Sequence, residues 1–326
     1  MNNPKKDVCI VGGGMGSLSA AIYLNKKGFD VSIYEKNSTL GGRANIIEEN
    51  GFKFDVGPSL LNYPWIFENL FKEAGEEMRE HIDLIEIDSG VKFLWDDKET
   101  FTITSDFPKL SNEIARLEKS HINGLNSFLK INSRRYNTAF EKLLNKNLDN
   151  PVRWGTGLGA KELFSGSMFK SMYKDLGVHF KSRHIKEAFG SYAMYLGGSP
   201  FKIPGFFSIL PYGEIAYGLW MPKGGIYSLI EKLEEILIKI GVKIYKDSPV
   251  KEIAIKDNKV YGIITESGDL ENYATVVSNV DLPTTEDKLL KNSSLNSFEK
   301  KQMTPSVMTF YWGLSKKTNF PHHMIF

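Results

Sequence analysis

The first fifty residues contain a glycine-rich turn that restricts the possible folds more than any other feature. Asp7–Val11 is a short apolar run, and Gly12–Ser17 follows it directly. Residues 15–27 then carry apolar side chains at helical spacing, and a second apolar run, residues 31–34, ends at Glu35. A strand, a glycine turn, a helix and a strand within about 30 residues predict a βαβ unit of a Rossmann-like parallel sheet.

The glycine turn has the chemistry of a dinucleotide site. Gly12 permits a sharp turn out of the strand, and Gly14 lets the backbone approach a pyrophosphate because it has no Cβ. Met15 and Gly16 begin the helix, where backbone N–H groups and the helix dipole favour a phosphate. Ser17 stands at the third glycine position of the fingerprint and is small enough to be tolerated there.

An acidic residue follows at the distance that this fingerprint requires, about 20 residues after the glycines. Glu35 ends the second predicted strand, where its carboxylate is expected to accept hydrogen bonds from an adenosine ribose. Lys36 comes next and is included among the predicted cofactor contacts. An acid here favours FAD or NAD over NADP, because it would repel a 2′-phosphate.

A second glycine turn separates FAD from NAD. Gly41-Gly42-Arg43 closely follows Glu35 and resembles the extended flavin motif of glutathione-reductase-like and amine-oxidase-like flavoproteins. Arg43 is expected to reach the pyrophosphate, and an ordinary surface arginine is the alternative. Gly57-Pro58-Ser59 would then lie near the flavin ring, although a plain turn after a strand is an equal alternative. We therefore predict FAD as the cofactor.

Composition excludes several classes of protein. The chain has 326 residues and a net charge of +2, too weak to indicate a nucleic-acid partner. Cys9 is the single cysteine, which rules out an internal disulfide and favours a reducing, cytoplasmic compartment. The start of the chain does not read as a signal peptide. No run approaches the roughly 20 apolar residues of a spanning helix, so membrane contact is expected only at the surface.

The sequence offers no separate set of catalytic side chains. We find no Ser/His/Asp combination and no cluster with metal-ligand spacing. His322 and His323 are neighbours whose rings would point apart on a strand, so no metal is expected. The catalytic residues are left unassigned, and the redox chemistry is assigned to the cofactor.

The pattern of elements predicts a chain that leaves the nucleotide domain and returns to it. Residues 1–63 and 222–300 are expected to form the FAD-binding domain, and residues 64–221 a mixed α+β substrate region. Residues 301–326 would start a substrate-domain sheet, with a strand at 307–314, and then stop as if truncated. Expected helices cover residues 65–74, 109–120, 125–144 and 225–240; expected strands cover residues 51–58, 91–104, 242–245, 250–255, 260–267 and 274–277.

Several segments resemble the bacterial-type phytoene desaturases, and they cover essentially the whole chain in order. They are residues 10–61, 195–237, 276–283 and 321–326. The second segment is the most particular to that family, because it contains Gly197-Gly198-Ser199-Pro200 and Pro222-Lys223-Gly224-Gly225. The resemblance implies non-covalent FAD, an apolar polyene substrate, hydride transfer from an allylic carbon to the flavin, and peripheral association with a membrane.

The resemblance also adds candidate residues. It implies that Val250 contacts the adenine through main-chain atoms, although Val250 reads equally well as core, and that Asn279 lies near the flavin. An aromatic stretch would line the polyene tunnel or touch lipid, with ordinary core packing as the alternative. Its candidate substrate residues are Phe201, Phe206, Phe207, Tyr212 and Trp220.

Other activities on the same scaffold remain open at this point. They include a carotenoid isomerase, a saturase and an end-group oxidase. A non-catalytic prenyl-binding protein of the GDP-dissociation-inhibitor type is a further alternative. The intact glycine turns, Glu35 and Arg43 argue against it. Family members continue beyond this point with a segment that closes over the flavin. The sequence predicts neither the exact carotenoid nor the oligomeric state.

Overall fold

A computed structural model describes residues 6–88, 90–119, 121–144, 167–290 and 303–326. The chain divides into two compact units, and each is made from two separate stretches. Unit 1 comprises Met1–Ile85 and Trp220–Gln302, and unit 2 comprises Glu86–Leu219 and Met303–Phe326. The first boundary follows Ile85 rather than residue 63, because Phe71, Met78 and Ile82 pack into the core of unit 1.

Unit 1 is built on a parallel sheet of four strands in the order β13-β1-β2-β9. These strands are β1 (Asp7–Val11), β2 (Asp30–Tyr34), β9 (Lys243–Tyr245) and β13 (Thr275–Ser278). Strand β13 therefore pairs with β1 from more than 260 residues away in sequence, and the predicted return of the chain to the nucleotide domain takes this form.

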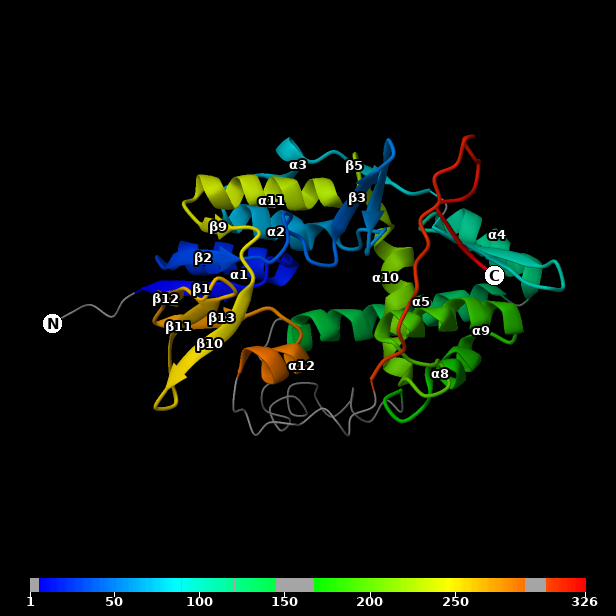
Figure 1. Cartoon of the computed structure of the whole chain (residues 1–326). Helices are drawn as coiled ribbons and strands as arrows, with labels where there is room; N and C mark the ends of the chain where they lie inside the picture. Colours follow the sequence, from blue (N-terminus) through cyan, green and yellow to red (C-terminus); the bar gives the residue numbers. More distant parts are fainter. Residues whose placement is uncertain (1–5, 89, 120, 145–166, 291–302) are drawn as a thin grey trace. The chain divides into compact units, whose positions relative to one another are not determined.

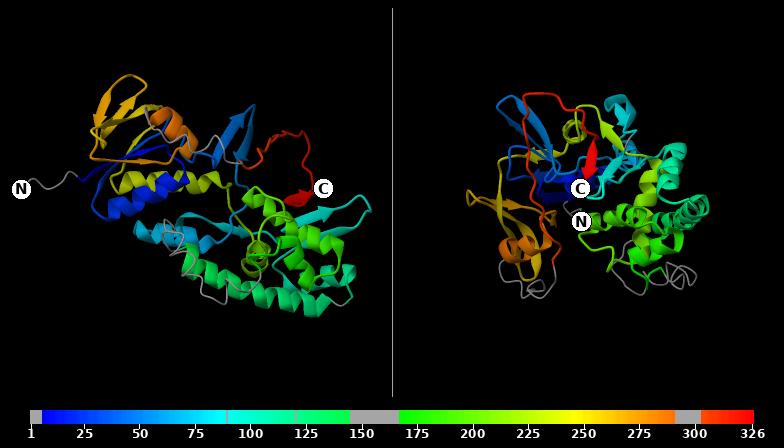
Figure 2. Two further views of the ribbon diagram at one scale, coloured as in Figure 1. Left: turned by 90° about the horizontal axis from the view of Figure 1, so that it is seen from below. Right: turned by 90° about the vertical axis from the view of Figure 1, so that its right-hand side faces the viewer.

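Alternate side chains of β1 pack on opposite faces of this sheet, as the two-residue period of a strand requires. Val8 and Ile10 join a core with α1 (Met15–Lys26), α2 (Pro64–Glu73) and α11 (Tyr227–Lys239). Cys9 and Val11 face a second sheet formed by β10 (Val250–Lys256), β11 (Lys259–Thr265) and β12 (Leu270–Asn272). Figures 1 and 2 show these layers, with the helices on one face and β10–β12 on the other.

Burial accounts for the single cysteine. Cys9 is fully buried in the layer between the two sheets, and burial raises the pKa of its thiol to about 12. A thiol that stays protonated at neutral pH is a poor nucleophile, so Cys9 acts as a small core residue.

Short elements complete unit 1. They are the hairpin of β3 (Asn45–Glu49) and β4 (Phe52–Val56), helix α3 (Met78–His81), the pair of β5 (Leu84–Glu86) and β8 (Trp220–Pro222), and helix α12 (Leu282–Thr284), which continues into a π-helical turn at Thr285–Leu289. The sequence patterns did not predict β3, β5, β8 or β12, because strands of three to five residues with exposed positions carry little periodicity.

Unit 2 is mainly helical around a small sheet. Strands β6 (Val91–Leu94) and β7 (Thr100–Ile103) form a hairpin, and β14 (His323–Ile325) pairs parallel with β6 (Figure 2). The helices are α4 (Phe107–Leu117), α5 (His121–Ala139), α8 (Met172–His179), α9 (Arg183–Gly190) and α10 (Ile209–Tyr217). Helix α5 continues as a π-helix at Phe140–Leu144, and 3₁₀ turns cover Ser191–Leu196 and Gly205–Ser208.

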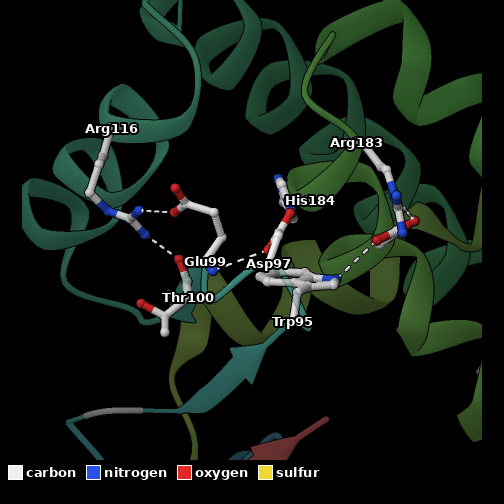
Figure 3. Close-up of polar contacts among 8 residues, drawn as sticks. Trp95, Asp97, Glu99, Thr100, Arg116, Arg183 and His184 are labelled. Carbon is white, nitrogen blue, oxygen red and sulfur yellow. Dashed lines mark hydrogen bonds and ion pairs between the residues drawn. The ribbon is translucent and has the colours of Figure 1, made fainter.

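Polar contacts attach the β6–β7 turn of unit 2 to α9 (Figure 3). The indole N–H of Trp95 donates to Glu187 at 2.9 Å, and the His184 ring packs edge-on against the indole with centroids 4.7 Å apart. His184 Nε2 lies 2.8 Å from Asp97 Oδ2. These contacts hold the hairpin in place, because each partner belongs to a different element.

The predicted strand at residues 307–314 is wrong. These residues have no regular secondary structure, and Val307, Met308 and Trp312 are more than three quarters exposed. An apolar pattern that reads as a strand forms one only where a neighbouring strand offers hydrogen bonds. No such neighbour pairs with these residues in the part of the chain that the structure describes.

Candidate functional site

The dinucleotide turn begins where β1 ends. The backbone N–H of Gly12 donates to Tyr34 O at 2.8 Å, which joins the turn to the end of β2. Ser17, at the third fingerprint position, is buried and donates its hydroxyl hydrogen to Gly12 O. The serine therefore closes the turn through its side chain, where a glycine would act through close packing alone.

Glu35 lies directly against this turn. Its side chain is 5% exposed, and its two oxygens accept backbone N–H groups from Gly13 at 2.6 Å and Asn37 at 2.9 Å. A carboxylate has about four lone-pair positions, so acceptor capacity remains for ribose hydroxyls. Lys36 follows and is exposed. The predicted ribose acid is thus held in place by the same loop that would bind the phosphates.

The second glycine turn is hydrogen-bonded to the first. Gly41 N donates to Gly13 O at 2.8 Å, and a Cβ added to Gly42 would lie 3.1 Å from the Cα of Gly14. Gly41 has φ +105°, and a Cβ there would overlap the carbonyl oxygen of Ala44. A side chain at either position would push the two turns apart, which explains why glycine is needed at both.

Arg43 and Asn279 flank the turn from different parts of the chain. Arg43 is 87% exposed and its Nη2 lies 3.1 Å from Asp281 Oδ1. Asn279 N donates to Val11 O at 2.9 Å. The Asn279 amide lies 2.9 Å and 2.7 Å from the positions that a Cβ on Gly14 and on Gly16 would occupy. Both predicted residues therefore lie beside the glycine turn.

The remaining predicted cofactor residues are near the same loops. A Cβ on Gly57 would overlap the carbonyl oxygen of Arg43, so Gly57-Pro58-Ser59 lies next to the second turn, with all three residues exposed. Val250 is half-buried at the start of β10 and packs in the cluster that contains Tyr34. Ser248 N donates to Glu35 O at 2.8 Å, which places the approach to Val250 beside the ribose acid.

The sequence analysis missed Asp55, which organises the far side of unit 1. Its carboxylate accepts the backbone N–H groups of Ile226 at 2.7 Å and Tyr227 at 2.9 Å, at the start of α11. A Cβ on Gly225 would overlap this carboxylate, and Gly225 has φ +97°. Gly224-Gly225 before a helix that has no capping side chain of its own was the signal for an acceptor from elsewhere.

The structure does not gather the predicted substrate residues into one place. Phe206 and Tyr212 are buried in unit 2, and Phe207 is half-buried with its ring 5.9 Å from that of Phe206. Phe201 is 65% exposed. Trp220 belongs to unit 1, where the guanidinium of Arg79 lies 5.6 Å from its ring centre. Burial alone therefore distinguishes core from surface within this aromatic stretch.

Two further features were examined within the described ranges. None of the helices there has the length and apolar content needed to cross a bilayer. No group of three or more His, Cys, Asp or Glu side chains in those ranges is placed to hold a metal ion. His322 and His323 are half-buried, and burial lowers the pKa of both imidazoles.

The site geometry and the sequence together match a known family. Residues 18–316 match the flavin containing amine oxidoreductases. The chain belongs to this family. Membership confirms the predicted FAD cofactor and the Rossmann-like FAD-binding fold. Putrescine oxidase has the same fold, with a TM-score of 0.54 at 15% identity over 83% of this chain and 57% of that one.

The relatives confirm the resemblance to carotenoid desaturases. The chain is 29% identical over 321 residues to a zeta-carotene-forming phytoene desaturase from Myxococcus xanthus, covering 98% of this chain and 62% of that protein. It is 32% identical over 320 residues to a phytoene desaturase from Phycomyces blakesleeanus, covering 96% and 55%. A 4,4'-diapolycopene oxygenase from Methylomonas sp is 29% identical over 329 residues, covering 100% and 66%. The chain thus spans between about half and two thirds of the length of these relatives.

Proposed function

We propose that this protein is an FAD-dependent desaturase of a long polyprenoid, either phytoene or a related carotenoid precursor. The supporting observation is the similarity along 96–98% of the chain to two phytoene desaturases. The intact dinucleotide site agrees with it, because every loop that would contact FAD in unit 1 is present.

The residues of unit 1 fit FAD. Glu35 would hold the adenosine ribose, and the amides of Gly14 to Gly16 would bind the pyrophosphate at the start of α1. Arg43 makes a single contact with Asp281, which leaves most of its five N–H donors for phosphate oxygens. When bound, FAD supplies the oxidising power by accepting a hydride. The chain's own contribution is binding, orientation and exclusion of water.

The location of the reaction is also a proposal. An apolar polyene is found in the lipid phase, and we propose that the protein is cytoplasmic and binds the membrane surface. The aromatic stretch from Phe201 to Tyr212 in unit 2 contains both exposed and buried rings, which suits contact with lipid or substrate. Co-sedimentation with lipid vesicles tests this, and a protein that stays entirely in the supernatant refutes it.

A sister activity is the second candidate. The Methylomonas relative is a 4,4'-diapolycopene oxygenase, so an end-group oxidase on the same scaffold is supported by a specific comparison. The two activities leave different products. A desaturase lengthens the conjugated system without adding oxygen, whereas an oxidase adds oxygen to the chain.

The deciding experiment uses the full-length protein, purified with its flavin and mixed anaerobically with phytoene in lipid vesicles. A desaturase bleaches the oxidised flavin and yields a longer polyene, identified by its absorbance and mass. Phytoene that is unchanged, together with a flavin that stays oxidised, would exclude phytoene as the substrate. A preparation without any flavin would instead favour a non-catalytic prenyl-binding protein.

A further inference from the structure

A buried acid in unit 2 has no role in the FAD site. Glu214 lies on α10 and is 3% exposed, and its Oε1 has no hydrogen-bond partner among the described residues. A buried polar atom without a partner costs free energy on the order of 1–3 kcal/mol. Native proteins rarely keep such groups, and those that they keep are concentrated at functional sites.

The structure makes room for this carboxyl. A Cβ on Gly90 would lie 2.8 Å from Glu214 Oε1, so any residue other than glycine would crowd the acid. Burial raises the pKa of Glu214 to about 7, and a hydrogen bond from the Tyr192 phenol offsets part of this rise. Neither contributor is a cation, so no salt bridge holds the proton off.

The groups that face Glu214 are phenols. Tyr192 and Tyr195 both belong to the 3₁₀ turn at Ser191–Leu196, and burial, followed by the nearby Glu214, raises the pKa of Tyr195. Helix α5 presents Tyr136 to Tyr212 and Tyr217 on the same α10. The turn at Gly205–Ser208 adds the buried hydroxyl of Ser208. The surroundings therefore contain polar groups but no charge beside the acid itself.

The other buried ionisable side chains described in unit 2 are already engaged. Asp175 accepts two hydrogen bonds from Arg135, at 2.6 Å and 3.1 Å. His179 Nδ1 lies 3.1 Å from Ser127 Oγ, and burial lowers the pKa of its imidazole. Within the described part of unit 2, Glu214 is thus the buried acid that has an oxygen still able to accept a proton.

An exposed apolar surface adjoins the acid. Met194, Tyr195 and Leu196 are 49%, 54% and 39% exposed, on the turn whose Tyr195 interacts with Glu214. Three consecutive exposed apolar side chains are the kind of surface that an apolar chain would cover. Glu214 therefore lies next to a surface suited to a polyene.

We propose that the Glu214 carboxylate accepts the proton that desaturation releases from the substrate. This rests on the proposed function. One allylic C–H bond breaks with its electron pair going to the oxidised flavin as hydride. A C–H bond on the adjacent carbon breaks, its electrons form the new C=C bond, and its proton goes to Glu214 Oε1. The carboxyl then loses this proton to water before the next turnover.

The test compares Glu214→Gln with Glu214→Asp and a matched control, Glu187→Gln, in full-length protein with bound flavin. Anaerobic flavin bleaching by the polyene is followed across pH 5–9. We expect the wild-type rate to rise about tenfold per pH unit below pH 7 and then level off. Glu214→Gln should lower the rate by about 100-fold or more and remove this rise. Glu214→Asp should restore the rise in part, and Glu187→Gln should keep it.

A second measurement does not depend on turnover. Infrared titration of the flavin-free protein should show a protonated-carboxyl band that disappears near pH 7 and is missing in Glu214→Gln. If the wild type bleaches and Glu214→Gln bleaches with the same rate and pH profile, the proton-acceptor role is overturned while the desaturase proposal stands. If the wild type does not bleach with any polyene, the desaturase proposal is overturned and the proton-acceptor role with it.

Discussion

Replacing Asp55 tests how unit 1 is held together. Asp55→Ala removes both oxygens that accept the N–H groups of Ile226 and Tyr227, at 2.7 Å and 2.9 Å. A hydrogen bond to a charged group contributes about 1.5–3 kcal/mol, and a helix cap about 1 kcal/mol. Asp55 is half-buried, so water replaces part of the loss. We expect a decrease of about 2–3 kcal/mol in the free energy of unfolding.

This decrease should propagate to the cofactor site, because α11 packs on α1 behind the glycine turn. Leu229, Ile230 and Leu233 are fully buried in the core shared with α1. Urea unfolding followed by circular dichroism measures the change, and FAD release during the titration reports on unit 1 alone. Asp55→Asn keeps one acceptor oxygen and should lose about half as much.

The matched control is Glu48→Ala on β3, the strand paired with the one that carries Asp55. Glu48 is exposed and has only a surface ion pair with Lys53, so its removal should change stability by less than about 0.5 kcal/mol. If Asp55→Ala is no more destabilising than Glu48→Ala, the carboxylate does not anchor α11 and the reasoning fails.

Three further predictions concern the flavin site and the buried acid. Glu35→Ala should weaken FAD binding roughly 10- to 150-fold by removing ribose hydrogen bonds; isothermal titration checks this, and unchanged affinity would place the ribose elsewhere. Gly41→Ala should destabilise unit 1 by about 1–3 kcal/mol because of its φ of +105° and overlap with the Ala44 carbonyl; a melting temperature equal to wild type contradicts it. The pKa of Glu214 is raised from 4.5 to about 7 in the folded state, so stability should fall by about 3 kcal/mol as pH rises from about 4.5 to 7. Glu214→Gln should lack this fall in pH-dependent unfolding, and a variant that keeps it would assign the fall to another group.

Local signals predicted the nucleotide half of the site well. Strand β1, helix α1 and strand β2 lie within one or two residues of their expected bounds, because a short apolar run, a glycine turn and a periodic helix are each encoded by neighbouring residues. Glu35 lies against the turn for the same reason, since the end of one parallel strand adjoins the end of the next. Its contact with a ribose stays a prediction.

Other features depend on residues far apart in the chain. The cap of α11 by Asp55 joins positions 171 apart, and the Arg43–Asp281 pair joins positions 238 apart. The apolar pattern of residues 64–85 did not reveal that these residues pack on the first sheet. Nor did the pattern of residues 307–314 reveal that no described neighbour pairs with them. Periodicity records which side chains are apolar, whereas the partner that covers them is set by tertiary packing.

The sequence by itself therefore determined the glycine turns, the ribose acid, the βαβ unit and the family, because each depends on residues close together or on a motif. Only the tertiary structure decided which residues complete the site. It placed Asn279 against Gly14 and Gly16, set Asp55 at the start of α11, and buried Glu214 without a partner for Oε1. Burial and hydrogen bonding across long separations are properties of the folded chain, and they give these ordinary polar residues their environment.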